Sequence, residues 1–228
     1  MDIVYILKNG GTFEELRYSL RSLDNFPHDN VWFYGGNPEG LIPDRQAAFQ
    51  QDGKNKWEKV RNSLFKVCQN EEISKEFWLF NDDFFCMRPC EGIPPYYDGT
   101  LYKRIVAVEQ RYRGFSPYSS ELRRTVRILE ENGLDVKNYA VHMPMLIDRE
   151  KALVVLDKFS ECPMFRSLYG NYWSIGGVEH KDVKIYLQNE EPDPESDWLS
   201  TSDLSFRQGA VGRYIRGVFE KAGVYERQ

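Results

Sequence analysis

The sequence is poor in the residues that build several common kinds of site. Only four of its 228 residues are cysteine and three are histidine. Cys86 and Cys90 form a C-x-x-x-C with no second pair to complete a four-ligand zinc site, so we expect free thiols in a reducing cytoplasm. No apolar run approaches the ~20 residues of a membrane-spanning helix, and the N-terminal segment lacks the basic stretch and cleavage site of a signal peptide. We therefore expect a cytoplasmic protein with no membrane span.

An excess of positive charge is also missing. Thirty Lys and Arg residues stand against 35 Asp and Glu residues, for a net charge of −5. This balance argues against a broad basic face for nucleic acid, although Arg-rich stretches at 111–127 and 207–216 are candidates for a local groove. Aromatic residues reach 14%. That level fits a cleft that stacks sugars or bases, but a well-filled core is the simpler account.

The order of the predicted elements indicates an α/β fold. Apolar strands are expected at 2–7, 30–36 and 76–80, and amphipathic helices at 12–26 and 55–70. In the first helix Thr12 is the expected N-cap, with Glu15 three residues on as its capping-box partner. Such a β-α-β-α-β order implies a mostly parallel central sheet flanked by helices.

The second half of the chain is less regular. Its predicted elements are a strand at 101–112, helices at 119–134 and 148–159, a strand at 182–188, an exposed acidic loop at 189–197 and a closing helix broken by Gly209, Gly212 and Gly217. Asp148 is the expected N-cap of the second of these helices. A chain of this length can bury a proper core, so we expect a single domain over 1–228. In it, 1–100 would form the nucleotide- and metal-binding half and 101–228 the acceptor-side half.

The segment FWLFNDDFFCMRP (77–89) places adjacent carboxylates, Asp82 and Asp83, at the end of the third strand inside an apolar run. Carboxylates in such surroundings need a cation, and ligands of parallel sheets bind beyond the carboxyl ends of the strands. Mg²⁺ and Mn²⁺ take oxygen ligands from one or two carboxylates and from substrate phosphates. The sequence has no Walker loop and no G-x-G-x-x-G. We therefore interpret Asn81, Asp82 and Asp83 as a metal site that holds a nucleotide diphosphate, with an acidic turn as the structural alternative.

Several segments, in the same order along the chain, resemble the Stealth family of sugar-phosphate transferases of bacterial capsule synthesis. FWLFNDDFFCMRP is similar to the family signature FLYLNDDFF, DIVYILKNG to its opening strand DIVYTWVDG, and ELRYSLRSLDNF to its ELRYSLRSIE. VHMPMLIDREKALVVL resembles the third block, which carries an HxPH, and FRSLYGNYW resembles the Arg-containing segment after it. The resemblance implies a GT-A-like fold, related to the Rossmann fold, that binds a nucleotide-sugar.

Carried over residue by residue, the resemblance implies roles for single side chains. Asp82 and Asp83 would hold the cation and the diphosphate. His142 would contact the phosphoryl or sugar group or act as base, and Arg166 would neutralise developing phosphate charge. Further residues expected at the nucleotide or sugar are Asp2, Asn9, Arg17, Asn62, Asn81 and Asn171. For several of these, His142 and Arg166 included, a structural role in a core or on the surface is the alternative.

The departures from the family pattern leave the transferred group open. LKNG replaces WVDG, HMPM lacks the second histidine of HxPH, and the region before ELRYSLRS is shorter. A second polar cluster, Glu179, His180 and Asp182, could supply a base or a metal ligand but is more typical of an exposed turn. Ser202 or Asp203 is expected to cap the last helix.

The sequence therefore predicts a metal-dependent transferase that takes a nucleotide-diphospho-sugar, with Mn²⁺ or Mg²⁺, and transfers a glycosyl or sugar-1-phosphate group. The acceptor could be a glycan, a protein or a modified nucleobase of a nucleic acid. One alternative is a non-catalytic protein that binds a nucleotide or sugar-nucleotide. Another is metal-dependent hydrolysis of a phosphate ester, which would need more metal ligands than the sequence offers.

Overall fold

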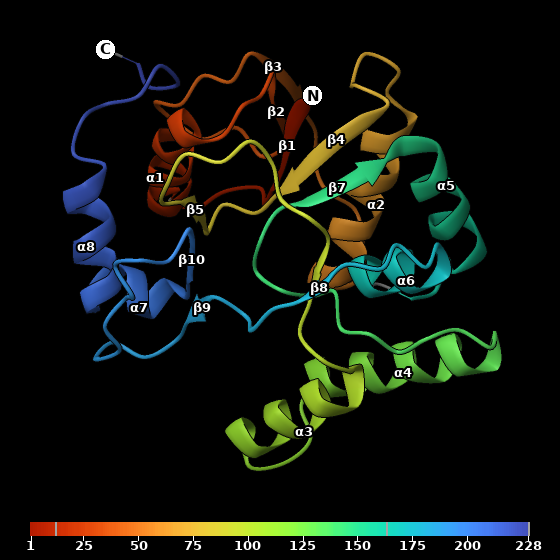
Figure 1. Cartoon of the computed structure of the whole chain (residues 1–228). Helices are drawn as coiled ribbons and strands as arrows, with labels where there is room; N and C mark the ends of the chain where they lie inside the picture. The colour runs from red at the N-terminus through yellow and green to blue at the C-terminus, as the bar shows by residue number, and fades with distance from the viewer. Residues whose placement is uncertain (12, 163, 228) are drawn as a thin grey trace.

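The computed structural model describes residues 1–11, 13–162 and 164–227, and its centre is a five-stranded sheet of order β3-β2-β1-β4-β7 (Figure 1). The first four strands in this order are parallel, and β7 runs antiparallel to β4. The bounds are Asp2–Leu7 for β1, Val31–Gly35 for β2, Arg45–Ala48 for β3, Glu76–Phe80 for β4 and Met145–Asp148 for β7. The prediction of an α/β protein with a mostly parallel sheet is confirmed.

The two faces of this sheet are covered by different helices. Ile3 and Tyr5 of β1 pack with Leu16 and Leu20 of α1 (Glu14–Ser22), which is followed by a short 3-10 turn, Leu23–Asn25. Val4, between them in the strand, belongs to the opposite cluster, which includes residues of α2 (Lys56–Gln69), α5 (Arg149–Lys158) and α6 (Phe165–Tyr172). Successive side chains of a strand point to opposite faces, so apolar strands of this kind need cover on both sides.

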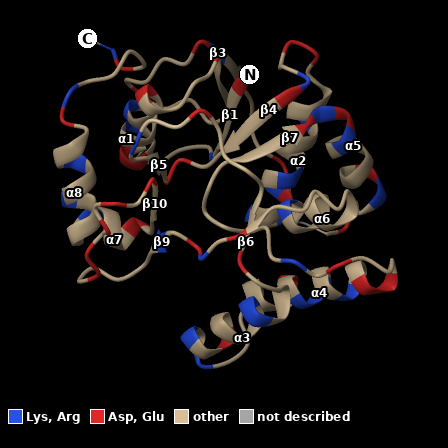
Figure 2. Cartoon of the chain, viewed as in Figure 1, with Lys and Arg blue, Asp and Glu red and all other residues tan. Residues whose placement is uncertain are grey.

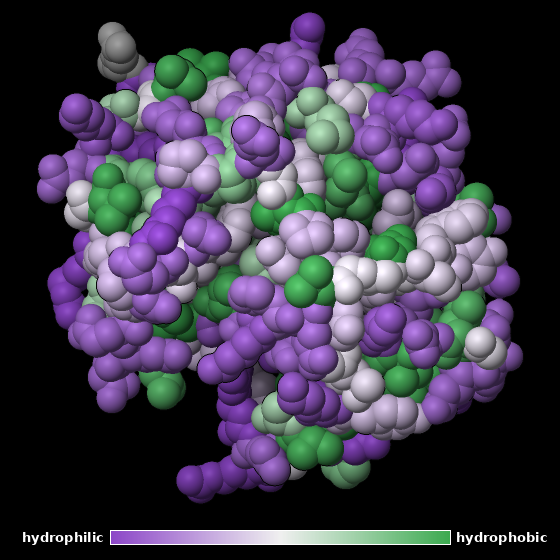
Figure 3. Space-filling model, viewed as in Figure 1, coloured by the Kyte–Doolittle hydropathy of each residue, from purple (hydrophilic) through white to green (hydrophobic). Residues whose placement is uncertain are grey.

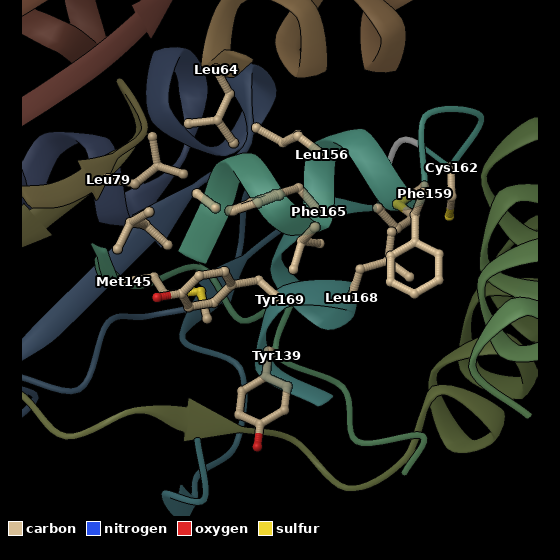
Figure 4. Close-up of a cluster of buried hydrophobic side chains, with 14 of the residues drawn as sticks. Leu64, Leu79, Tyr139, Met145, Leu156, Phe159, Cys162, Phe165, Leu168 and Tyr169 are labelled. Carbon is tan, nitrogen blue, oxygen red and sulfur yellow. The ribbon is translucent and has the colours of Figure 1, made fainter. Parts of the chain in front are cut away.

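Part of the second cluster is drawn in Figure 4. Leu64 from α2, Leu156 from α5 and Phe165 from α6 gather beside Leu79 of β4, and all four are buried. Burying one such side chain contributes about 1.5–3 kcal/mol relative to leaving it in water. The cluster therefore fixes α2 and α6 against the carboxyl end of β4, where the acidic pair follows.

The strand predicted at 101–112 is wrong, because this segment is the helix α3 (Leu101–Tyr112). Its buried residues Leu101, Ile105 and Val108 recur at helical spacing, and the Thr100 side chain accepts a hydrogen bond from the Lys103 backbone N–H. The helix predicted from 119 is confirmed as α4 (Pro117–Glu131) with an earlier start. Figure 1 shows α3 and α4 as a hairpin that projects below the sheet.

The chain after α6 pairs with earlier segments to form smaller elements. A three-stranded sheet of order β5-β10-β9 joins Phe84–Cys86, Trp198–Thr201 and Lys184–Ile185, so the strand predicted at 182–188 is confirmed only over two residues. Two further short strands, β6 (Tyr96–Tyr97) and β8 (Val178–Glu179), pair in parallel. The closing helix is two helices, α7 (Asp203–Gln208) and α8 (Ala210–Val218), which separate only at Gly209.

The predicted helix caps have different outcomes. Asp148 caps α5 by accepting a hydrogen bond from the Lys151 N–H at 3.0 Å, and Ser202 caps α7 by accepting one from the Ser205 N–H. Thr12, the expected cap of α1, lies outside the described residues. All four cysteines are free thiols, as expected, and Cys86 Sγ lies 3.7 Å from Cys90 Sγ.

Charges of both signs are interspersed over the surface (Figure 2). Arginines of the stretch 111–127 pair with carboxylates, as in Arg123–Glu109 and Arg124–Glu161. The face seen in Figure 3 likewise mixes hydrophilic and hydrophobic side chains. Among the described residues, no helix combines the length and the apolar character needed to cross a membrane.

Candidate functional site

A cleft of about 420 Å³ opens at the carboxyl ends of β1 and β4, and we call it the charged cleft. The chain places β2 and β3 on one side of β1 and β4 on the other, and open α/β sheets bind ligands at such a switch in strand order. Four lysines line it: Lys8 after β1, Lys56 and Lys59 in the first turn of α2, and Lys184 of β9. Four carboxylates from α1, α7 and the end of β4 face these cations: Glu15, Asp82, Asp83 and Asp203.

Asp83 is buried and already has a cation. Its Oδ2 accepts hydrogen bonds from Lys184 Nζ at 2.7 Å and from Ser200 Oγ at 3.0 Å. Lys184 comes from β9 and Ser200 from β10, so the small sheet delivers both donors to the end of β4. Within the chain itself, the cation that offsets Asp83 is therefore Lys184.

Asp82 is different, because its carboxylate has no hydrogen bond or ion pair with a side chain of the described residues. Burial, and then the negative charge of Asp83, raise its pKa to about 6, while Lys8 acts in the opposite direction. A cation that reaches a carboxylate in such surroundings stabilises its ionised form. In the described part of the chain no three His, Cys, Asp or Glu side chains gather closely enough to hold a metal ion. A metal at Asp82 would take its remaining oxygen ligands from substrate phosphates and water.

Glu15 is a cleft residue that the sequence did not single out for chemistry. Its Oε1 accepts a hydrogen bond from Thr201 Oγ1 at 2.6 Å. Burial raises its pKa to about 7, and the charges of Asp83 and Asp82 add to this. The sequence offers Glu15 only as a capping-box residue, and no local pattern relates it to a threonine 186 positions away.

His142 forms a close pair with Asp182. Its Nδ1 lies 2.9 Å from both carboxylate oxygens of Asp182, and its backbone N–H donates to Oδ1 at 3.1 Å. Arg104 Nη1 lies 3.6 Å from the same carboxylate. Burial lowers the pKa of His142, although the hydrogen bond and the charge of Asp182 act to raise it. Burial opposes ionisation of Asp182 too, but the hydrogen bonds and charges of His142 and Arg104 hold its pKa at about 2.

This pair stands beside the charged cleft. Asp182 and Lys184 are two residues apart at β9, so one segment supplies the partner of His142 and the partner of Asp83. The side chain of His142 is 20% exposed but does not line the charged cleft. Of the exposed turn expected at 176–182, Glu179 and His180 are exposed as predicted, but Glu179 belongs to strand β8 and the Asp182 side chain is only 11% exposed.

Arg166 connects α6 to the end of β4. Its guanidinium donates to the carbonyl oxygens of Met143 at 2.5 Å and Leu79 at 3.2 Å, and it lies 5.3 Å from the centre of the Phe84 ring. Burial lowers the pKa of Arg166 to about 10, and the charge of Asp83 opposes the shift. Arg166 thus lies close to the acidic pair, but its guanidinium N–H groups donate to backbone carbonyls.

Of the predicted asparagines, Asn81 lines the charged cleft and Asn9 supports its wall. Asn81 is exposed and lines it directly. Asn9, in the loop after β1, donates from Nδ2 to the Phe49 carbonyl at 2.9 Å and accepts from the Gln51 N–H at 2.8 Å. Asn9 therefore fixes the segment that carries Gln51, a residue of the cleft wall.

Asp2 and Arg17 do not line the charged cleft. Asp2 begins β1, at the opposite end of the strand from the cleft. It accepts hydrogen bonds from the Ser74 N–H at 2.9 Å and from Trp32 Nε1 at 3.2 Å. Arg17 forms an ion pair with Glu226 near the end of the chain. The contacts of both residues tie segments of the fold together.

Asn62 and Asn171 are likewise held by structural contacts. Asn62 lines a separate surface pocket, where it accepts from Arg61 Nη1 at 3.2 Å. Asn171 is buried in α6; its Oδ1 accepts from the Lys137 N–H at 3.0 Å, and its Nδ2 donates to the Lys137 carbonyl at 2.9 Å. The predicted set therefore divides into a group at the end of β4 and a group that organises other parts of the fold.

No protein-family model matches the chain, and the search of curated proteins found no match either. The chemistry of this site therefore rests on its own geometry.

Proposed function

We propose that this protein is a metal-dependent transferase of GT-A-like fold that uses a nucleotide-diphospho-sugar as donor. The observation that carries the proposal is the unpaired carboxylate of Asp82 in a lysine-lined cleft at the switch in strand order. A cleft with both a metal-binding carboxylate and cations for phosphate suits a diphosphate better than a neutral ligand. The resemblance of the NDD segment to the Stealth signature supports the same donor class.

The lysines would bind the diphosphate. Lys56 and Lys59 lie in the first turn of α2, where the partial positive charge of the helix also favours anions. Lys8 faces them from the end of β1. An ammonium group binds phosphate oxygens as a compact point charge, so these three residues can follow the diphosphate along the cleft.

Mn²⁺ or Mg²⁺ would bind at Asp82, with Asp83 as second carboxylate. Both hydrogen bonds that described side chains donate to Asp83 go to Oδ2, so Oδ1 would be available to the metal ion. When bound, the ion would neutralise the diphosphate that leaves. Lys184, fixed at Asp83, adds a positive charge that belongs to the chain itself.

The transfer itself needs a base for the acceptor. In glycosyl transfer the acceptor hydroxyl oxygen bonds to the anomeric carbon, the bond from that carbon to the diphosphate oxygen breaks, and the hydroxyl proton goes to the base. In sugar-1-phosphate transfer the oxygen attacks the β-phosphorus instead, and the nucleoside monophosphate leaves. Glu15, in the cleft wall with a pKa near 7, and His142, whose Nε2 is free of described hydrogen bonds, are the two candidate bases.

The Asp83–Lys184 ion pair also favours a second candidate function. A lysine held at this carboxylate occupies a position where a metal-dependent enzyme would place its ion. The protein would then bind a nucleotide or sugar-nucleotide without turning it over.

The two functions are separated by a thermal-shift panel of UDP-, GDP-, ADP-, TDP- and CMP-sugars, each with and without Mn²⁺. We expect one nucleotide to raise the melting temperature of the wild type only with Mn²⁺, and Asp82→Asn to abolish the effect. Ligand at 100 times its Kd stabilises by about 2.7 kcal/mol, which is several degrees. Asp193→Asn, in the exposed acidic loop, is the matched control.

Equal stabilisation without metal, and no release of nucleotide over hours, would favour the binding protein. Absence of a shift with every donor would overturn both functions and leave Asp82–Asp83 as a structural acidic turn.

A further inference from the structure

A second pocket, of about 350 Å³, adjoins the charged cleft, and we call it the apolar pocket. Its walls are Trp57 and Leu64 of α2, Leu122 of α4, Ala140, and Met164 and Phe165 at the start of α6. Figure 4 shows Leu64 and Phe165 within the core cluster from which this wall is built. Asn81 and Asp82 line both cavities, so the unpaired carboxylate stands where the two meet.

Two polar side chains that line this pocket away from its mouth, Ser167 and Arg166, already make hydrogen bonds within the fold. Ser167 Oγ accepts a hydrogen bond from the Tyr139 N–H at 3.2 Å. The guanidinium of Arg166 donates to the carbonyls of Leu79, Val141 and Met143. A hexose placed here would leave several hydroxyls without partners, and each buried unpaired hydroxyl costs free energy. The pocket therefore suits an apolar group, because Asn81 and Asp82 at its mouth supply its amide and carboxylate groups and the inner lining adds only the Trp57 indole N–H and the Ser167 hydroxyl.

We infer that the apolar pocket binds the acceptor, and that the acceptor carries an aromatic or aliphatic group next to the hydroxyl that is modified. This inference rests on the proposed transferase function. An apolar group seated between α2 and α6 places a neighbouring hydroxyl at Asn81 and Asp82, where the charged cleft would present the donor. A volume of 350 Å³ accommodates a one- or two-ring system.

A nucleobase is the other planar apolar group in the reaction, but its recognition uses hydrogen bonds along its edge. Away from its mouth, the described lining of the apolar pocket offers two single donors, the Trp57 indole N–H and the Ser167 hydroxyl, and no amide or carboxylate to pair with a base edge. The charged cleft, by contrast, is lined by four lysines and by Gln51, whose Nε2 donates to Ser63 Oγ while its Oε1 accepts no hydrogen bond from the described residues. The donor therefore fits the charged cleft and the acceptor the apolar pocket.

The test compares two ligands that differ only in the apolar group: 4-nitrophenyl β-D-glucopyranoside and methyl β-D-glucopyranoside. Calorimetric titration of the full chain, without donor, should give about 30-fold tighter binding of the aryl glycoside, the gain expected from burying one aromatic ring. In Ala140→Phe, which fills the pocket, the two glycosides should bind equally. Ala107→Phe, on the exposed surface of α3, is the matched control and should keep the preference.

Trp57→Ala, which removes one wall without filling the space, is the second variant and should reduce the preference if Ala140→Phe fails to fold. Equal binding of both glycosides by the wild type would overturn the inference. Displacement of the aryl glycoside by uridine or adenosine would overturn it as well, because the pocket would then hold the base of the donor. Stabilisation by donor and Mn²⁺ should persist in Ala140→Phe. If it is absent even in the wild type while the aryl preference stands, the transferase function fails and the pocket remains an apolar ligand site.

Discussion

Lys184 Nζ lies 2.7 Å from Asp83 Oδ2, and the two side chains are 16% and 11% exposed. Asp83 lies in the turn between β4 of the main sheet and β5 of the small sheet, and Lys184 belongs to β9, so this ion pair ties that turn to the far strand of the small sheet. The segment NDDFF gains its stability in an apolar region from a lysine that lies 101 positions away in the sequence.

Removing one partner of this pair should cost more than removing both. Lys184→Met leaves the Asp83 carboxylate buried and unpaired, and we expect a loss of about 3 kcal/mol in the free energy of unfolding. Lys184→Met with Asp83→Asn should recover most of that loss, because no buried charge remains. Urea unfolding of the single and double variants measures both quantities. Equal stability of wild type and Lys184→Met would show that the pair contributes nothing.

The hydrogen bond from His142 to Asp182 should determine which imidazole nitrogen carries the proton. Asp182 accepts from Nδ1, so neutral His142 should carry its proton there and leave Nε2 as the acceptor. Asp182→Asn should lower the pKa of His142 further, since the carboxylate is the group that raises it against burial and Lys184. Nitrogen chemical shifts of labelled histidine report tautomer and pKa together. His180, whose Nδ1 contacts only a backbone carbonyl, is the internal control, and an unchanged His142 titration would contradict the prediction.

Glu226 should make the stability of the fold depend on acid pH. Hydrogen bonds from Arg21 and Arg17 lower its pKa from 4.5 to about 2. Its stabilising effect is therefore complete above pH 4.5 and is lost as the pH falls towards 2. Glu226→Gln should cost roughly 2 kcal/mol at pH 7 and less at pH 3, measured by urea unfolding at each pH.

A matched variant for that experiment is Glu195→Gln. Glu195 pairs with Arg88 but is 78% exposed, whereas Glu226 is 7% exposed. The control should change stability by less than about 0.5 kcal/mol at either pH. A loss in Glu226→Gln that is the same at pH 3 and pH 7 would show that the effect does not come from the charge.

Replacing each of two glycines of α8 by alanine should change the stability of the protein in opposite directions. A Cβ on Gly212 would lie 1.7 Å from the Phe206 carbonyl oxygen, so Gly212→Ala must push α7 and α8 apart and should cost about 3 kcal/mol. A Cβ on Gly217 meets nothing within 4 Å, and Gly217→Ala should stabilise the helix by up to about 1 kcal/mol. Thermal unfolding of both variants provides the comparison. Equal melting temperatures would show that α7 and α8 can separate at little cost.

Three strands of the main sheet could be predicted because each has a recognisable pattern in its own short segment of sequence. VWFYG is apolar, DIVYIL and EFWLF are apolar after their first residue, and paired glycines or polar residues follow them. The edge strand β3 could not, because RQAA is largely exposed and has no alternating pattern. LYKRIVAVEQRY has β-branched residues that favoured a strand, but Leu101, Ile105 and Val108 at helical spacing decide the outcome once they are buried.

The candidate site was predictable only in part. Asp82, Asp83 and Asn81 follow from one strand end, and their placement in a cleft follows from parallel topology. Glu15, Lys184 and Asp182 were missed in these roles, because each meets its partner across a long stretch of sequence. Asp2 looked functional by resemblance and Asn171 by its place near Arg166 in the sequence. The structure gives both residues hydrogen bonds to the backbone that any well-formed core would need.

The span between Asp83 and Lys184 also has a consequence for how the molecule folds. Strands β1, β2 and β4 and helices α1 and α2 come from the first 80 residues, and their contacts close short loops. The charged cleft, however, is walled only after β9 and β10 have docked onto β5, which closes a loop of about a hundred residues at a larger entropic cost. During refolding, the tryptophans of β2 and β4 should therefore be buried before any ligand can bind, and the recovery of binding should trail the fluorescence change.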